Sequence, residues 1–322
     1  MLRRQLPLLA ALACPGVVQA QAPWPTRPVR IVVTFPPGGS SDIVARVLAE
    51  HYSAAFGQRF IVDNRPGAGG TLAARHVAEQ PADGYTWMLS NSAPIVNSPP
   101  LYRAPGYDPI TGFAHVAYIG AAPTVLVVNP ARVPAATLPE FTAWVRAQPT
   151  PPGFGSSGAG SVGHVLGEMY MRQSGTQLTH VPYRGSAPML ADLLGGAVPL
   201  AFDTLPQNVE HIRSGRLRGI VVSSPVRSPM APDVPTTAEG GMPELVATNW
   251  MGMSAPAGLP PAVATRLHAE TQTALASELI QRRLADHGVA PTAMSSAQFQ
   301  EFVARDVRQI GGMIRALGIS AE

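Results

Sequence analysis

The feature that most constrains the fold is a regular alternation of short apolar β-branched runs with amphipathic helical stretches. In the first ninety residues this alternation has the order strand–helix–strand–helix–strand, which is the pattern of a doubly wound parallel α/β sheet. A proline- and glycine-rich break separates the first strand from its helix, and Gly57 closes that helix. The elements predicted here are strands at Val29–Phe35, Phe60–Val62 and Thr86–Ser90, and helices at about Ile43–Phe56 and Thr71–Glu79.

After a proline-rich, irregular stretch at residues 91–115, the alternation resumes. Thr137-Leu138-Pro139-Glu140 has the pattern of a capping box and predicts the start of a helix. Further strands are predicted at Val116–Ile119, Val125–Val128, Phe154–Ser156, Leu178–Pro182, Leu200–Phe202, Gly219–Ser223 and Trp250–Ser254. Further helices are predicted at about Val162–Gln173, Ser186–Leu194, Gln207–Arg213, Pro261–Ala276, Glu278–His287 and Ser296–Leu317. A strand, a Gly/Ser loop and a helix occur at 29–56 and again at 154–173, so we expect two similar α/β lobes that meet at a cleft.

The first twenty residues have the pattern of an export signal. A basic start at Arg3 and Arg4 precedes the apolar run Leu6–Cys14 and the small-residue cleavage site Val18-Gln19-Ala20. The run is too short to span a bilayer, which needs about 20 apolar residues. The alternative is an ordinary buried N-terminal helix. We expect residues 1–20 to be a cleaved signal peptide and the product to be a soluble protein of the cell envelope.

The single cysteine, Cys14, could alternatively be lipidated, but the leucine usual three positions upstream is absent. Cleavage at Ala20 would otherwise leave a chain with no thiol, which excludes disulfides and a cysteine nucleophile. All 23 basic residues are arginine, so lysine-based chemistry is excluded as well. A net charge of +3 argues against a nucleic-acid partner.

Two Gly/Ser loops each lead into a predicted helix, at Pro36–Ser41 and at Ser157–Ser161. A helix start presents unpaired backbone N–H groups and a positive dipole end, which together favour an anion. Ser40, Ser41, Ser157 and Ser161 add hydroxyl donors. The alternative is that the serines only cap helices. Because the arrangement occurs once in each expected lobe, we favour binding.

Two carboxylates lie close to this pattern. Asp42, at the first helix start, complements the helix dipole, and we expect its backbone N–H rather than its charge to serve a ligand. Asp203 follows a predicted strand. It could accept a hydrogen bond from a ligand amine or hydroxyl, or could cap a helix, and both alternatives stay open.

Catalytic and cofactor signatures are weaker. Gly158-x-Gly160-x-x-Gly163 matches a dinucleotide fingerprint, but the ribose-binding acid expected about 20 residues later is missing. Ser161 in Ala159–Gly163 resembles a nucleophile elbow, for which Asp203 and one of three histidines, His211, His268 or His287, could nominally complete a triad. The spacing of His164 from Ser161 suits capping or ligand contact better. No histidine pair has metal-site spacing, so we expect neither a metal nor a cofactor.

An ordered set of motifs resembles the tripartite tricarboxylate transporter solute-binding family, also called the Bug family. The resemblance covers about Trp24 to Ile319. Its motifs are Trp24–Val33, Phe35–Arg46, Asp63–Gly70, Pro81–Thr86, Ser157–Ser161 with His164, Val181–Ser186, Leu193–Gly196, Phe202–Pro206 and Ser254–Gly258. The stretch Ser90–Pro100 departs from the family pattern.

The resemblance implies a type II periplasmic binding protein: two α/β lobes joined by two crossover strands, near Ile119–Val127 and Val246–Met253, with a carboxylate held between them. Lobe one would comprise residues 24–122 and 250–322, and lobe two residues 123–249. The implied protein is a non-catalytic monomer that delivers a small organic acid to membrane permease subunits; the alternatives are a sensor for a two-component system and a Ser-dependent hydrolase. Carried over by matching position, the implied ligand-binding residues are Gly39, Ser40, Ser41, Asp42, Ser90, Ser92, Ser157, Ala159, Gly160, Ser161, His164 and Asp203.

Overall fold

The computed structural model describes residues 24–317, so the predicted signal peptide and Cys14 lie outside the described residues. The first half of the fold is built on three parallel strands, with β1 (Val29–Val33) between β2 (Phe60–Asn64) and β3 (Thr86–Asn91). Helices α1 (Ser40–Phe56) and α2 (Thr71–Ala78) connect them. The parallel βαβαβ unit predicted from the sequence is confirmed.

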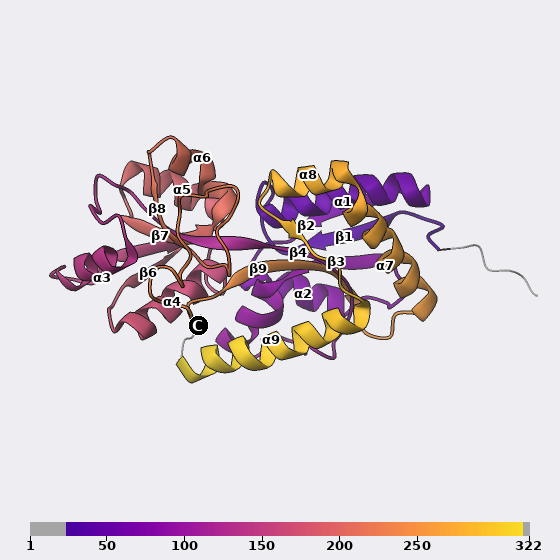
Figure 1. Cartoon of the computed structure of the whole chain (residues 1–322). Helices are drawn as coiled ribbons and strands as arrows, with labels where there is room; N and C mark the ends of the chain where they lie inside the picture. The colour runs from indigo at the N-terminus through magenta and orange to yellow at the C-terminus, as the bar shows by residue number, and fades with distance from the viewer. Residues whose placement is uncertain (1–23, 318–322) are drawn as a thin grey trace, which may run out of the picture.

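The second half contains β5 (Gly153–Ser156), β6 (Thr179–Pro182), β7 (Leu200–Thr204) and β8 (Arg218–Val222). Strand β5 pairs in parallel with β6 and with β7. The helices of this half are α3 (Leu138–Arg146), α4 (Val162–Ser174), α5 (Ser186–Gly195) and α6 (Leu205–Arg213). Figure 1 shows this half side by side with the first, and two long strands running between them.

The two long strands are β4 (Phe113–Val128) and β9 (Thr248–Pro256). The sequence predicts two separate strands where β4 stands, and this prediction is wrong. Gly120, Ala121 and Pro123 are weak strand formers, but β4 is held on both sides of them. It pairs antiparallel with β9 as far as Pro123 and with β7 from Thr124 onward.

The pairing of β4 joins both halves into one strand order, β2-β1-β3-β9-β4-β7-β5-β6. The end of the chain returns to the first half through α7 (Pro261–Ala276), α8 (Glu278–Ala285), the short β10 (Ala290–Pro291) and α9 (Ser296–Leu317). Residues 91–112, predicted as irregular, contain two short helical segments at Ala93–Asn97 and Pro99–Leu101. None of the helices in residues 24–317 combines the length and the apolar character that crossing a membrane requires.

Local signals in the sequence set several of these boundaries. Helix α3 starts at the predicted capping box, where Thr137 Oγ1 accepts a hydrogen bond from Glu140 N at 3.3 Å. The Glu140 carboxylate in turn accepts from Ala136 N at 2.8 Å. Helix α1 ends at Gly57, whose φ of 67° lies in the left-handed region that favours glycine.

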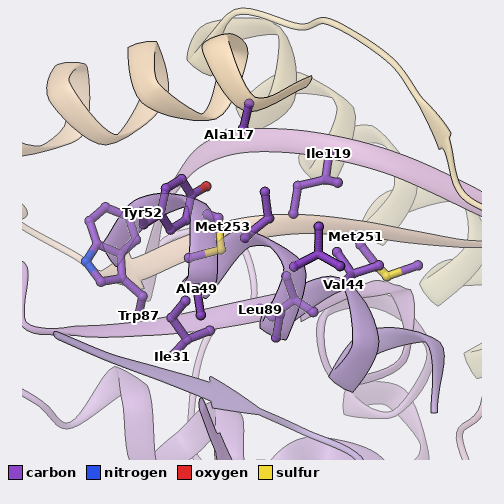
Figure 2. Close-up of a cluster of buried hydrophobic side chains, with 14 of the residues drawn as sticks. Ile31, Val44, Ala49, Tyr52, Trp87, Leu89, Ala117, Ile119, Met251 and Met253 are labelled. Atoms are coloured by element: carbon purple, nitrogen blue, oxygen red, sulfur yellow. The ribbon is translucent and has the colours of Figure 1, made fainter. Parts of the chain in front are cut away.

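One core of the first half lies between the sheet and helices α1, α7 and α8 (Figure 2), and a second lies on the other face, against α2 and α9. Trp87 is fully buried in the first of these cores, and its indole N–H donates to Gly84 O at 2.7 Å. Tyr52 of α1 contacts Thr271 of α7 through a hydroxyl–hydroxyl hydrogen bond of 2.7 Å. The second half has hydrophobic clusters of its own, on both faces of its sheet. Each half therefore has a core of its own, and Leu101 and the far end of α9, at Ile314, pack from the first half into a cluster of the second.

Candidate ligand-binding site

A cavity of about 210 Å³ lies between the two halves. It is lined by segments that follow the carboxyl ends of strands, with residues from the β1–α1 loop on one side and from the β5, β6 and β7 connections on the other. In open α/β sheets this edge is where ligands bind. The geometry therefore places the predicted Gly/Ser loops opposite each other across one cavity.

Four helices begin at the cavity wall. Ser40 and Ser41 open α1, Ser161 caps α4, and Ser186 opens α5, with Thr204 as the N-cap of α6. Each helix directs the positive end of its dipole at the cavity. The sequence predicts a helix start at Ser186 and another near Gln207 as well, but it assigns only the first two of the four helix starts to the binding site.

Unpaired backbone donors accompany the helix starts. In α1 the first backbone hydrogen bond is donated by Ile43 N to Gly39 O, so the N–H groups of Ser40, Ser41 and Asp42 have no acceptor within the helix. In α4 the first is donated by Val165 N to Ser161 O, and Ser161 Oγ accepts from His164 N. The N–H groups of Val162 and Gly163 are therefore the ones that α4 leaves for an anion.

The charge of Asp42 is occupied inside the protein. Its carboxylate oxygens accept hydrogen bonds from Gly38 N at 2.9 Å, from Asn64 Nδ2 at 2.9 Å and from the Arg46 guanidinium at 2.9–3.0 Å. Burial raises the pKa of Asp42, but the hydrogen bonds from Arg46, Gly38 and Asn64 outweigh it and hold the pKa below its usual value. Asp42 stays ionised, and its charge is directed into this network rather than at a ligand.

Asp203 lies behind the cavity wall and does not line it. It is 2% exposed, and it accepts hydrogen bonds from Ser186 Oγ at 2.8 Å and Asn208 Nδ2 at 3.1 Å. Burial raises the pKa of Asp203 to about 6, although the bonds from Ser186, Thr204 and Asn208 oppose the shift. These contacts are not a helix cap, which was the second role left open by the sequence. Instead the carboxylate positions Ser186, which does line the cavity.

The second Gly/Ser loop is held by its own hydrogen bonds. Gly160 N donates to His164 Nδ1 at 3.1 Å, and Ser161 N donates to Gly158 O at 3.1 Å. The His164 ring stacks on His180 with the ring centroids 3.9 Å apart. Burial and the neighbouring His164 lower the pKa of His180 to about 3, so that ring is neutral at neutral pH. His164 thus supports the loop from behind.

The predicted site residues divide into two groups. Those that line the cavity are Gly39, Ser40, Ser41, Ser157 and Ser161. Those that do not are Asp42, Ser90, Ser92, Ala159, Gly160, His164 and Asp203. Ser90 Oγ is hydrogen-bonded within the sheet, to Gly252 O at 3.0 Å and Ser254 Oγ at 2.7 Å. Ser92 lines a separate cavity against α9, and Ala159 lines the neighbouring cavity described below.

Sequence reasoning missed several lining residues, of which Arg184 and Gln207 matter most. Arg184 is the only charged side chain among the described residues that line the cavity, and within residues 24–317 it forms no ion pair. Gln207 Nε2 donates to Ser40 Oγ at 3.3 Å and so connects the two halves across the cavity. The motif Val181–Ser186 contains Arg184 and was a usable signal, whereas Gln207 stands in an ordinary helical pattern.

The histidines considered for a triad lie in other environments. His211 contacts Arg216 at 2.6 Å, and His268 Nδ1 lies 3.0 Å from Val116 O. Among residues 24–317, no hydrogen bond joins Ser161 or Asp203 to His211, His268 or His287.

Comparison with known proteins gives matches over most of the chain. Residues 44–319 match the tripartite tricarboxylate transporter family receptor. Protein BugT of Bordetella pertussis (strain Tohama I) is 37% identical over 296 residues, which cover 92% of this chain and 90% of that protein.

Two solved structures share the fold over nearly the whole chain. R. palustris Rpa4515 with adipate is 35% identical, with a TM-score of 0.86 over 92% of this chain and 99% of that one. The periplasmic binding protein BugD is 32% identical, with a TM-score of 0.85 over 92% of this chain and 99% of that one. The predicted α/β periplasmic binding fold is confirmed, and the chain belongs to the tripartite tricarboxylate transporter receptor family of solute-binding proteins.

Proposed function

We propose that this protein is a periplasmic solute receptor that binds a small organic acid and delivers it to membrane permease subunits, without catalysing a reaction. The observation that carries the proposal is one cavity at which four helices begin and at which Arg184 is the only charged residue among the described lining residues. Helix N-termini and a guanidinium both attract a carboxylate, and no acidic side chain among the described lining residues opposes them. The adipate bound to Rpa4515 supports an acid as the ligand.

The proposed clamp consists of two sets of hydrogen-bond donors, one in each lobe. Lobe one, residues 24–122 and 250–322, supplies the N–H groups of Ser40, Ser41 and Asp42. Lobe two, residues 123–249, supplies those of Val162 and Gly163 together with Arg184. Hydrogen bonds to a charged group contribute about 1.5–3 kcal/mol each, so three bonds at the upper end of this range reach micromolar affinity. A ligand that contacts both sets of donors stabilises the closed arrangement of the lobes, because its contacts are stronger in that arrangement.

The test of the proposal is a thermal-shift screen of small acids, each paired with its uncharged amide. We expect at least one acid to raise the melting temperature in a concentration-dependent way, and its amide to have no effect. Mass spectrometry of the mixture should recover the acid unchanged. A ligand bound equally well as its amide would contradict the clamp, and a new product would contradict the non-catalytic role.

Delivery to a permease is tested in cells. Uptake of the acid should require both this protein and the permease subunits, and intact-mass analysis should place the mature N-terminus at Gln21. If loss of the protein abolishes a transcriptional response to the acid but leaves uptake intact, the protein is a sensor and the transport part of the proposal is wrong.

A further inference from the structure

A second, larger cavity of about 670 Å³ lies next to the first. The two cavities have five lining residues in common: Phe35, Pro36, Ser157, Arg184 and Gly185. We call the cavity of about 210 Å³ the inner cavity and the larger one the outer cavity. Because they share one wall, a ligand anchored in the inner cavity has the outer one directly beside it.

The strand order explains where the outer cavity lies. Strands β2 and β6 form the two ends of the order β2-β1-β3-β9-β4-β7-β5-β6. The outer cavity is lined by the Pro66–Gly70 loop after β2 and by Pro182 and Tyr183 at the end of β6. The inner cavity lies nearer the crossover strands, where Asn249 of β9 lines it. The cleft between the halves therefore continues from the crossover strands outward to the edge strands.

The lining of the outer cavity suits an uncharged part of a ligand. Its described walls contain aromatic rings, prolines and glycine backbone, and Arg184 at the shared wall is their only charged residue. The Tyr183 ring is fixed because its hydroxyl donates to Asp192 at 2.8 Å. At one side the cavity is closed, since a Cβ added at Gly69 would lie 2.8 Å from Ala159 O across the cleft. Ser98 Oγ donates to Gly69 O at 2.9 Å and holds that side in place.

Size separates the roles of the two cavities. Sites for drug-sized ligands measure roughly 300–1,000 Å³, so the inner cavity of about 210 Å³ falls below this range and the outer cavity falls within it. The inner cavity can hold an acid group and a few attached atoms. An apolar group in the outer cavity would be buried away from water, in contact with the aromatic rings and prolines of the cavity wall.

We infer that the outer cavity is a second subsite, which takes the apolar or aromatic tail of the ligand. This inference rests on the proposed function. The ligand is accordingly an elongated acid whose carboxylate lies in the inner cavity and whose tail passes Arg184 into the outer one. Each methylene buried there strengthens binding by at most about fourfold.

The test is calorimetry with acetate, butanoate, hexanoate and phenylpropionate. For the unmodified protein we expect affinity to rise along this series. Pro182→Trp places a bulky ring in the outer cavity alone, because Pro182 does not line the inner one. Among the acids that bind the unmodified protein, this variant should bind the shortest one with unchanged affinity. It should lose the increase in affinity that longer tails give.

The matched control is Pro151→Trp, the same change on an exposed proline that precedes the amino end of β5, whereas Pro182 lies at the carboxyl end of the parallel strand β6. It should behave like the unmodified protein. Pro66→Trp, from the other wall of the outer cavity, provides a second blocking variant if Pro182→Trp does not fold.

The outcomes separate the two proposals. If short acids bind but affinity falls or stays level with tail length, or if both blocking variants retain the gain, the second subsite is wrong and the acid receptor stands. If none of the acids binds to any of the proteins, the result contradicts the proposed acid receptor and the subsite falls with it.

Discussion

The substitution Val162→Pro tests the backbone part of the clamp. Val162 is the first residue of α4, and Ser161 before it has φ −64° and ψ 158°. That extended conformation is the one a residue before proline prefers, and the first helical position tolerates proline because its N–H has no partner within the helix. The change therefore removes one free donor at the cavity wall and leaves the helix intact.

The expected loss follows from the bond that is removed. A hydrogen bond to a charged group contributes about 1.5–3 kcal/mol, which corresponds to a roughly 10- to 150-fold weaker Kd for the acid. The matched control is Val162→Ala, which keeps the N–H and removes part of the buried side chain. Both variants should lose some stability, and only the proline variant should lose this much affinity.

Isothermal titration calorimetry with an acid from the thermal-shift screen measures both affinities, and circular dichroism checks that both variants are folded. If Val162→Pro and Val162→Ala bind the acid equally well, the N–H of Val162 does not contact the ligand. The proposed role of the α4 N-terminus would then be wrong, whatever the acid.

Three further predictions concern charge and stability. Asp203 has a folded-state pKa of about 6, above its ordinary 3.8, so the folded protein holds this proton more tightly than the unfolded chain and stability falls as pH rises through this window. Between pH 4 and pH 7 the loss is about 2 kcal/mol, and Asp203→Asn should remove it, as urea unfolding of both proteins at these two pH values would measure; equal pH dependence would contradict the assignment. Arg184→Met should weaken acid binding at low salt and reduce its salt dependence, which calorimetry at two ionic strengths checks; an unchanged salt dependence would exclude a direct charge contact. Thr137→Ala removes the cap of α3 and should cost about 0.5–2 kcal/mol of stability without changing acid affinity, as denaturation and calorimetry together would show.

Elements with strong local signals could be predicted from the sequence almost to the residue. Helix α7 occupies the predicted Pro261–Ala276, and α9 the predicted Ser296–Leu317. The local pattern did not predict that β4 is continuous through Gly120–Pro123, because this depends on partners far away in the chain; only the family resemblance implied a crossover strand near Ile119–Val127. No local window contains that information.

The site shows the same division between local and tertiary information. Ser40 and Ser161 could be found because a glycine–serine loop before a helix is a local pattern. The starts of α5 and α6 reach the same cavity only because β7 and β6 both lie beside β5 in the sheet. Ser90 does not line this cavity, because its hydroxyl is directed to Ser254 within the sheet, and its position in the sequence does not reveal that direction.

The continuity of β4 also determines how the two halves can move. Its partner changes at Pro123 and Thr124 while the strand itself continues, and β9 pairs with it up to that point. We expect a hinge of this kind to bend by a joint twist of the two hydrogen-bonded strands, rather than by rotation in a flexible loop. The backbone amides beside the hinge stay paired while the cleft opens, so they should exchange slowly with solvent deuterium both with and without acid. The same pairing leaves a protease no extended, unpaired stretch of β4 at the hinge, so the ligand-free protein should resist cleavage there even when its cleft stands open.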